Sequence, residues 1–86
     1  MFQKDVTVVN PTGLHARPAA QLTKLCRQYP ETIRLATATK EIDPKNVMAI
    51  MSAGMKKGTL VTVKVTGENE EAVCNTVVEF IRNLQD

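Results

Sequence analysis

The chain is poor in aromatic residues and has a single histidine. Its 86 residues include no Trp, one Tyr and two Phe, so it lacks the stacking platforms that many RNA-binding domains use. Eleven basic and nine acidic residues leave a net charge of +2, too small an excess for a nucleic-acid or membrane-surface binder. No run is apolar and long enough to span a bilayer, and the first residues form no apolar signal region. We therefore expect a cytoplasmic protein with no nucleic-acid partner and no membrane insertion.

Cysteine is also scarce. Cys26 and Cys74 are too few and too far apart in the sequence to indicate a metal site. Both fall where a helical pattern requires apolar residues, so we expect two buried thiols that act as small hydrophobic residues. A disulfide is not expected in a reducing compartment. Nothing in the sequence implies a metal or an organic cofactor.

The length and apolar content suit one small domain over residues 1–86. Alternating apolar residues and turn formers predict strands at about 2–9, 32–37, 39–42 and 59–66. Helical periodicity predicts helices at about 16–27, 47–53 and 68–84. The order β-α-β-β-α-β-α favours an α+β fold, a two-layer sandwich in which a four-stranded antiparallel sheet is covered on one face.

His15 lies directly before a predicted helix. Pro18 is tolerated in the first helical turn, which places the helix start at about Ala16. A helix start presents unpaired N–H groups and a positive dipole of roughly half an elementary charge. A His in this place is most often only a capping or surface residue. Here Gly13 lets the chain bend sharply and Arg17 supplies a guanidinium, and the combination indicates a histidine that carries a phosphoryl group.

Three segments of the chain resemble one known family. Residues 10–20, NPTGLHARPAA, are similar to the active-site segment of HPr, the phosphocarrier of the bacterial sugar phosphotransferase system. Residues 48–54, MAIMSAG, resemble the family's short middle helix, and residues 57–59, KGT, resemble the entry to its last strand. The resemblance extends over essentially the whole chain, and it implies an open-faced sandwich with three helices on one face of the sheet.

The resemblance also implies a function. His15 would accept a phosphoryl group from phospho-Enzyme I, through Nδ1, and pass it to EIIA components of sugar permeases. The backbone N–H groups of Ala16 and Arg17 would hold the phosphoryl group, the Arg17 side chain would compensate its charge, and Pro18 would set the helix start. Such a protein is a carrier and not a free-standing enzyme. Because it must present one face to successive partners, we expect a monomer.

The predicted helix at residues 47–53 is short and rich in methionine. Most Met stripes face a core, but a helix of two turns has to share its apolar residues between two faces. An exposed, flexible Met patch suits a protein that binds several partners in turn. The resemblance implies a docking surface around His15 made of Leu14, Ala20, Gln21, Lys24, Val47, Met48 and Met51.

Asn46 departs from a pattern found in many HPr proteins, which carry a regulatory serine at this position. Asparagine caps a helix about as well as serine, but it has no hydroxyl to phosphorylate.

Three alternatives to a sugar-branch phosphocarrier stay open. A paralogous phosphocarrier of a nitrogen-regulatory or fructose-specific branch would share the active-site segment. A non-catalytic interaction or RNA-binding domain is disfavoured by the few aromatics, and a hydrolase by the lone His and the absence of a second catalytic group beside it.

Overall fold

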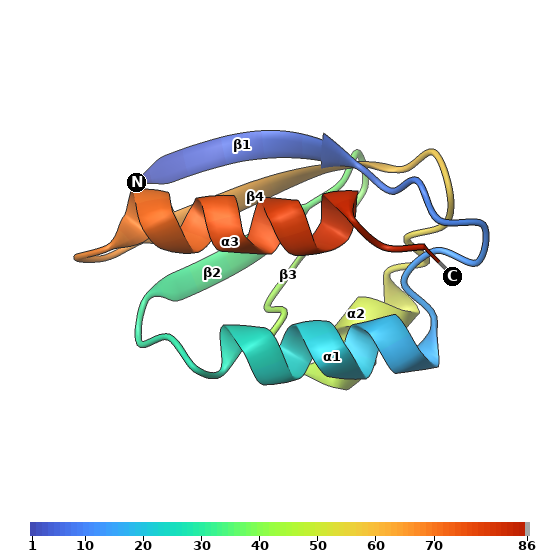
Figure 1. Cartoon of the computed structure of the whole chain (residues 1–86), viewed down its shortest axis with the longest axis horizontal. Helices are drawn as coiled ribbons and strands as arrows, with labels where there is room; N and C mark the ends of the chain where they lie inside the picture. The colour runs from blue at the N-terminus through green and yellow to red at the C-terminus, as the bar shows by residue number, and fades with distance from the viewer. Residues whose placement is uncertain (86) are drawn as a thin grey trace.

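The computed structural model describes residues 1–85, and within them the chain forms four strands and three helices. The elements are β1 (Phe2–Thr7), α1 (Ala16–Cys26), β2 (Thr32–Ala36), β3 (Glu41–Ile42), α2 (Val47–Ser52), β4 (Leu60–Thr66) and α3 (Glu70–Arg82). The sheet has the order β1-β4-β2-β3, and each neighbouring pair is antiparallel. In Figure 1, α3 crosses in front of the sheet, and α1 runs beside it with α2 behind. The α+β open-faced sandwich predicted from the sequence is confirmed.

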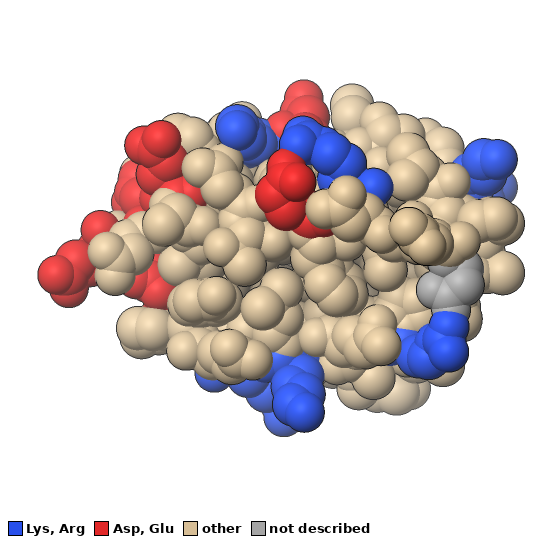
Figure 2. Space-filling view, viewed as in Figure 1, with Lys and Arg blue, Asp and Glu red and all other residues tan. Residues whose placement is uncertain are grey.

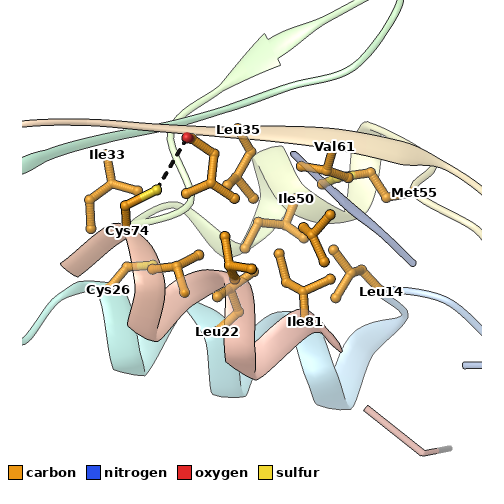
Figure 3. Packing of buried hydrophobic residues seen from close by; sticks show 14 of the residues in the cluster. Leu14, Leu22, Cys26, Ile33, Leu35, Ile50, Met55, Val61, Cys74 and Ile81 are labelled. Atoms are coloured by element: carbon orange, nitrogen blue, oxygen red, sulfur yellow. Dashed lines mark hydrogen bonds between the residues drawn. The ribbon is translucent and has the colours of Figure 1, made fainter. Parts of the chain in front are cut away.

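The core lies between the sheet and the helices. Val61, Val63 and Val65 of β4 are fully buried, whereas the residues between them are half-buried and those at the two ends of the strand are exposed, as their alternation predicts. Figure 3 shows side chains from α1, α2, α3 and the strands pointing toward one another in this core. Cys26 and Cys74 are buried free thiols, and Cys74 Sγ donates to the Val63 carbonyl at 3.4 Å. The prediction of two buried cysteines is therefore confirmed.

The predicted strand at 39–42 is too long. Only Glu41 and Ile42 pair with β2, because a turn occupies the residues before them. The Thr37 hydroxyl accepts hydrogen bonds from the amides of Thr39 and Lys40 at 3.4 and 3.2 Å, and the Thr37 amide donates to the Lys40 carbonyl at 2.7 Å. A local side-chain bond of this kind competes with the strand ladder, so β3 starts two residues later than predicted.

The N-terminal ends of α2 and α3 carry residues that favour a helix start. The Asn46 side chain accepts hydrogen bonds from the amides of Met48 and Ala49 and so caps α2, as predicted. Glu70 and Glu71 place negative charge in the first turn of α3, where the helix dipole favours it. The Asn46 cap and the acidic first turn of α3 thus favour the observed starts of these two helices.

Candidate functional site

A tight turn joins β1 to α1 and delivers His15 to the start of α1. The Asn10 carbonyl accepts the Gly13 amide at 3.2 Å, which closes a four-residue turn. The Asn10 side chain donates from Nδ2 to the Gly13 carbonyl at 2.7 Å. Gly13 has a φ of +66°, a conformation that glycine adopts without steric cost. The bend expected at Gly13 is therefore present.

Leu14 attaches this turn to the segment that follows α2. Its amide donates to the Met55 carbonyl at 2.8 Å, and its side chain is only 4 % exposed, packed in the core (Figure 3). Leu14, expected on the docking surface, is therefore mostly buried, although it also lines a hollow beside His15. A part for Leu14 in docking stays a prediction.

His15 is exposed and is the N-cap residue of α1. Its backbone is extended, with φ −77° and ψ −170°, and its carbonyl accepts the Ala19 amide at 2.9 Å. Within residues 1–85 the imidazole makes no capping hydrogen bond to the helix. The ring is therefore available for chemistry at the positive end of α1.

The first turn of α1 provides the other groups predicted for the site. Ala16 and Arg17 are its first two residues and both are exposed, so their N–H groups lie at the end of the helix where a bound anion is favoured. Pro18 is buried in the same turn and has no N–H to contribute. The predicted start of the helix at Ala16 is confirmed, and Arg17 brings a guanidinium to the end that His15 caps.

A shallow hollow lies beside His15. It has a volume of about 320 Å³ and is lined by Thr12, Leu14, His15, Met51, Gly54, Met55 and Lys56. Sequence reasoning missed Thr12 and Lys56 as residues of this site. Thr12 lies in the turn itself, three residues from His15, and could have been considered. Lys56 lies at the hollow because the preceding residue, Met55, is hydrogen-bonded to Leu14. The sequence does not predict this contact between distant segments.

The other residues of the expected docking surface lie on α1 and α2. Ala20, Gln21 and Lys24 of α1 are exposed, and Met48 and Met51 of α2 are 67 % and 43 % exposed. Met55, which continues the same spacing, is 3 % exposed and belongs to the core. The methionines are thus divided between the surface and the core.

Val47 is half-buried between α1 and α2. There it lines a groove of about 300 Å³ together with Ala20, Thr23, Lys24 and Arg27. Arg27 was not predicted for this surface. Its Nε donates to the Lys45 carbonyl at 2.9 Å, which ties the end of α1 to the residue before the α2 cap. A patch defined by Ala20, Gln21, Lys24, Val47, Met48 and Met51, called the α1–α2 face below, therefore adjoins His15.

Charge is distributed unevenly along the molecule. The helix α1 carries Arg17 and Lys24 and no acidic residue. Acidic side chains gather at the opposite end, at the left of Figure 2, where α3 begins with Glu70 and Glu71. The buried Glu31 lies at that end too, and its carboxylate accepts the Asn69 amide at 3.1 Å. The end of the molecule that carries His15 is therefore the one suited to negatively charged groups.

The described part of the chain has neither a grouped set of metal ligands nor a membrane-spanning helix. Over residues 1–85 no three His, Cys, Asp or Glu side chains are grouped so as to hold a metal ion. None of the described helices has the length and apolar character needed to cross a membrane. The exposed His15 at the start of α1, beside a hollow, makes this terminus the site that the geometry supports best.

Comparison with known proteins agrees with this site. Residues 2–83 match the family model described as "PTS HPr component phosphorylation site". The chain belongs to the HPr family. HPr proteins are phosphocarriers of the phosphotransferase system, as the resemblance of residues 10–20 implied.

Individual HPr proteins are similar over nearly the full length. The phosphocarrier protein HPr of Pseudomonas aeruginosa is 35 % identical over 83 residues, which cover 95 % of this chain and 92 % of that protein. The crystal structure of HPr from Thermoanaerobacter tengcongensis superposes with a TM-score of 0.88 at 32 % identity, covering 94 % of this chain and 91 % of that one. A dimer of HPr from the same organism gives 0.72 at 32 % identity, with 94 % and 93 % covered. Because HPr relatives include a dimer, the monomeric state expected for this chain stays a prediction.

Proposed function

We propose that this chain accepts a phosphoryl group from the phosphohistidine of Enzyme I on His15 and transfers it to a histidine of an EIIA component of a sugar permease. The observation that carries the proposal is the position of His15. His15 is the N-cap residue of α1 and its side chain is exposed, and Arg17 is the second residue of the same helix. The membership in the HPr family supports the general role of phosphocarrier, and the donor and acceptor are part of the proposal.

The transfer is an exchange of one N–P bond for another. In its neutral form the imidazole of His15 carries a lone pair on Nδ1, which attacks the phosphorus atom of the donor phosphohistidine. A bond forms between Nδ1 and phosphorus, while the bond from phosphorus to the donor nitrogen breaks and its electron pair returns to the donor imidazole. Each ring keeps the proton on its other nitrogen, so no net proton transfer is required. The same step in reverse delivers the group to the acceptor.

The N-terminus of α1 would stabilise the phosphoryl group on His15. The amides of Ala16 and Arg17 and the helix dipole favour a negative charge at this end, and the Arg17 guanidinium can pair with phosphoryl oxygens. The side chain of Arg17 is exposed, which leaves the group accessible to the next protein. A carrier should hold its phosphoryl group only moderately, since a deep energy well would slow onward transfer.

The α1–α2 face is the proposed docking surface for both partners. It combines exposed methionine side chains, which adapt to different surfaces, with the positive charge of Lys24. Partners with an apolar patch and an acidic rim would fit it. Because one face serves two partners in succession, each complex should be weak and short-lived.

Phosphorylation by Enzyme I and phosphoenolpyruvate tests the proposal. The wild type should gain a single acid-labile phosphoryl group, measured by intact mass, and His15→Ala should gain none. A known HPr in a parallel reaction shows that the Enzyme I is active. If the folded wild type gains no phosphoryl group while the known HPr does, the proposal is wrong for this donor. Such a result would favour a paralogous branch with another donor, or an interaction domain.

A further inference from the structure

The peptide group between Gly13 and Leu14 is held at both ends. Its carbonyl oxygen, on Gly13, accepts a hydrogen bond from Asn10 Nδ2 at 2.7 Å. Its N–H, on Leu14, donates to the Met55 carbonyl at 2.8 Å. Since the two bonds pull on opposite sides of one planar unit, this peptide cannot rotate without breaking at least one of them. It is the unit that precedes the peptide leading into His15.

Asn10 controls both polar groups of Gly13. Besides the side-chain bond to the Gly13 carbonyl, the Asn10 carbonyl accepts the Gly13 amide at 3.2 Å. Asn10 is only 1 % exposed, and an amide buried to that degree is costly unless it is hydrogen-bonded. A turn of this kind needs no buried Asn side chain for its closure, because the backbone bond alone closes it. The bond from the buried Asn10 Nδ2 therefore holds the Gly13 carbonyl in its direction.

The direction of that carbonyl bears on His15 through the backbone. Leu14 cannot adjust independently, because its side chain is 4 % exposed in the core and its amide is bound to Met55, itself 3 % exposed. His15 follows with an extended backbone and then enters α1. The Gly13 carbonyl and the Leu14 amide belong to one peptide group, so a rotation of that group would break the Leu14–Met55 bond and shift the chain leading into His15. The Asn10 bond opposes this rotation.

We propose that Asn10 is a positioning residue for phosphoryl transfer at His15. Asn10 holds the Gly13 carbonyl, and in this way it sets the orientation of the His15 ring relative to the N-terminus of α1. A nucleophile must approach phosphorus in line with the bond that breaks, and a displacement of about 1 Å can cost up to a hundredfold in rate. The inference rests on the proposed function, because it assumes that His15 accepts a phosphoryl group.

The test compares Asn10→Ala with a variant at the far end of the molecule. Glu31→Gln is the matched control, since Glu31 is also a buried polar residue that holds a backbone amide, that of Asn69. Two phosphoryl donors are used for each protein. Enzyme I with phosphoenolpyruvate tests docking and transfer together, and phosphoramidate, a small donor, tests transfer without docking. Melting temperatures are measured so that rates are compared where every variant is folded.

Asn10→Ala should lower kcat with Enzyme I by between about tenfold and a hundredfold. The KM for Enzyme I should stay unchanged, because the α1–α2 face is intact. The rate with phosphoramidate should fall by the same factor. Glu31→Gln should keep wild-type rates with both donors even where its melting temperature is lower. If Asn10→Ala does not fold, Asn10→Ser takes its place, because a serine hydroxyl can be satisfied within the turn without reaching the same carbonyl.

Two results would overturn the inference. One is a folded Asn10 variant that transfers at the wild-type rate with both donors. The other is a loss of rate that Glu31→Gln shows equally, since that would assign the effect to stability alone. A failure of the proposed function looks different. In that case the wild type itself gains no phosphoryl group from Enzyme I, and the phosphoramidate reaction still reports whether Asn10 positions His15.

Discussion

A β-carbon on Gly13 would lie 2.5 Å from the carbonyl oxygen of Met55 and 2.7 Å from the α-carbon of Lys56. Real β-carbons essentially never approach backbone atoms so closely. The turn before His15 therefore rests directly on the backbone of residues 55 and 56, with no side chain between them. This contact brings Met55 within reach of the Leu14 amide, and it is the reason why the hollow beside His15 includes residues from both segments.

We expect Gly13→Ala to destabilise the protein more than Gly54→Ala. Both glycines have a φ of +66°, but no described atom lies within 4 Å of the position of a β-carbon on Gly54. Gly54→Ala should cost about 1–2 kcal/mol, the steric cost of a left-handed conformation. Gly13→Ala should cost this amount and more, because the backbone of residues 55 and 56 has to move. Denaturant unfolding measures both, and equal losses of free energy would contradict the close contact.

Much of the fold could be predicted because its signals are local. The alternation of apolar and polar residues at 60–66 predicts which side of β4 is buried. Asn46 marks the start of α2 because its side chain can accept backbone amides, and Pro18 marks the first turn of α1. These residues act within a few positions of themselves, so the sequence carries the information. His15 could be selected for the same reason, since its neighbours define its setting.

The remaining features depend on contacts between distant segments. Leu14 has the same apolar character whether it faces a partner or the core, and its burial depends on contacts with distant segments, such as the one with Met55. Lys45 Nζ donates to the carbonyls of Tyr29 and Glu31 at 2.7 and 2.9 Å. These bonds connect two loops, and no sequence pattern predicts them. The role proposed for Asn10 has no signal in the sequence either, because a turn-forming residue is expected to be exposed and Asn10 is buried.

Replacing both exposed methionines of α2 should weaken docking and leave the chemistry intact. Met48→Ser with Met51→Ser should raise the KM for Enzyme I by about tenfold, corresponding to about 1.4 kcal/mol of binding energy, with kcat unchanged. The melting temperature should change little, since both side chains are exposed. Leu60→Ser is the matched control, because Leu60 is 56 % exposed at the start of β4 and lines neither the hollow beside His15 nor the groove between α1 and α2. A KM that rises equally in the control would argue against a docking role for the methionines.

The two N-cap asparagines should differ in their contribution to stability. Asn46 accepts from two amides of α2, whereas within the described residues the Asn69 side chain makes no capping bond to α3. Asn46→Ala should therefore cost about 1 kcal/mol, and Asn69→Ala clearly less. Asn46→Ser should restore most of the loss, because serine caps a helix comparably. Thermal unfolding of the variants measures these differences, and similar losses for both alanine variants would contradict the assignment.

The cysteines should be unreactive in the folded protein. Burial raises the pKa of the Cys26 thiol to about 12 and also raises the pKa of Cys74, so few thiolates form at a pH of about 8, where free thiols react. A thiol reagent should label neither residue in the native protein and both in denaturant. Rapid labelling of the native protein at the rate of a free thiol would show that one of the two sites opens readily.

Stability should fall on the acid side of the pH range, and Glu70 should account for part of the loss. The hydrogen bond from the Gly67 amide, and then the N-terminal ammonium of Met1, lower the pKa of Glu70 from its ordinary value of 4.5. The unfolded state therefore takes up a proton at a higher pH than the folded state does. The stabilising effect is complete above 4.5 and is lost as the pH falls through the lower folded value.

Glu41 behaves in the same way, because a hydrogen bond from Lys64 at 3.0 Å lowers its pKa. Glu70→Gln and Glu41→Gln keep the shape of each side chain and remove its titration. Each variant should be less stable than the wild type at neutral pH, and its melting temperature should decline less steeply below a pH of about 4.5. Melting curves followed by circular dichroism test this, with the double variant expected to show the shallowest decline. If the melting temperature of the double variant falls with pH as steeply as that of the wild type, other carboxylates control the acid unfolding of the chain.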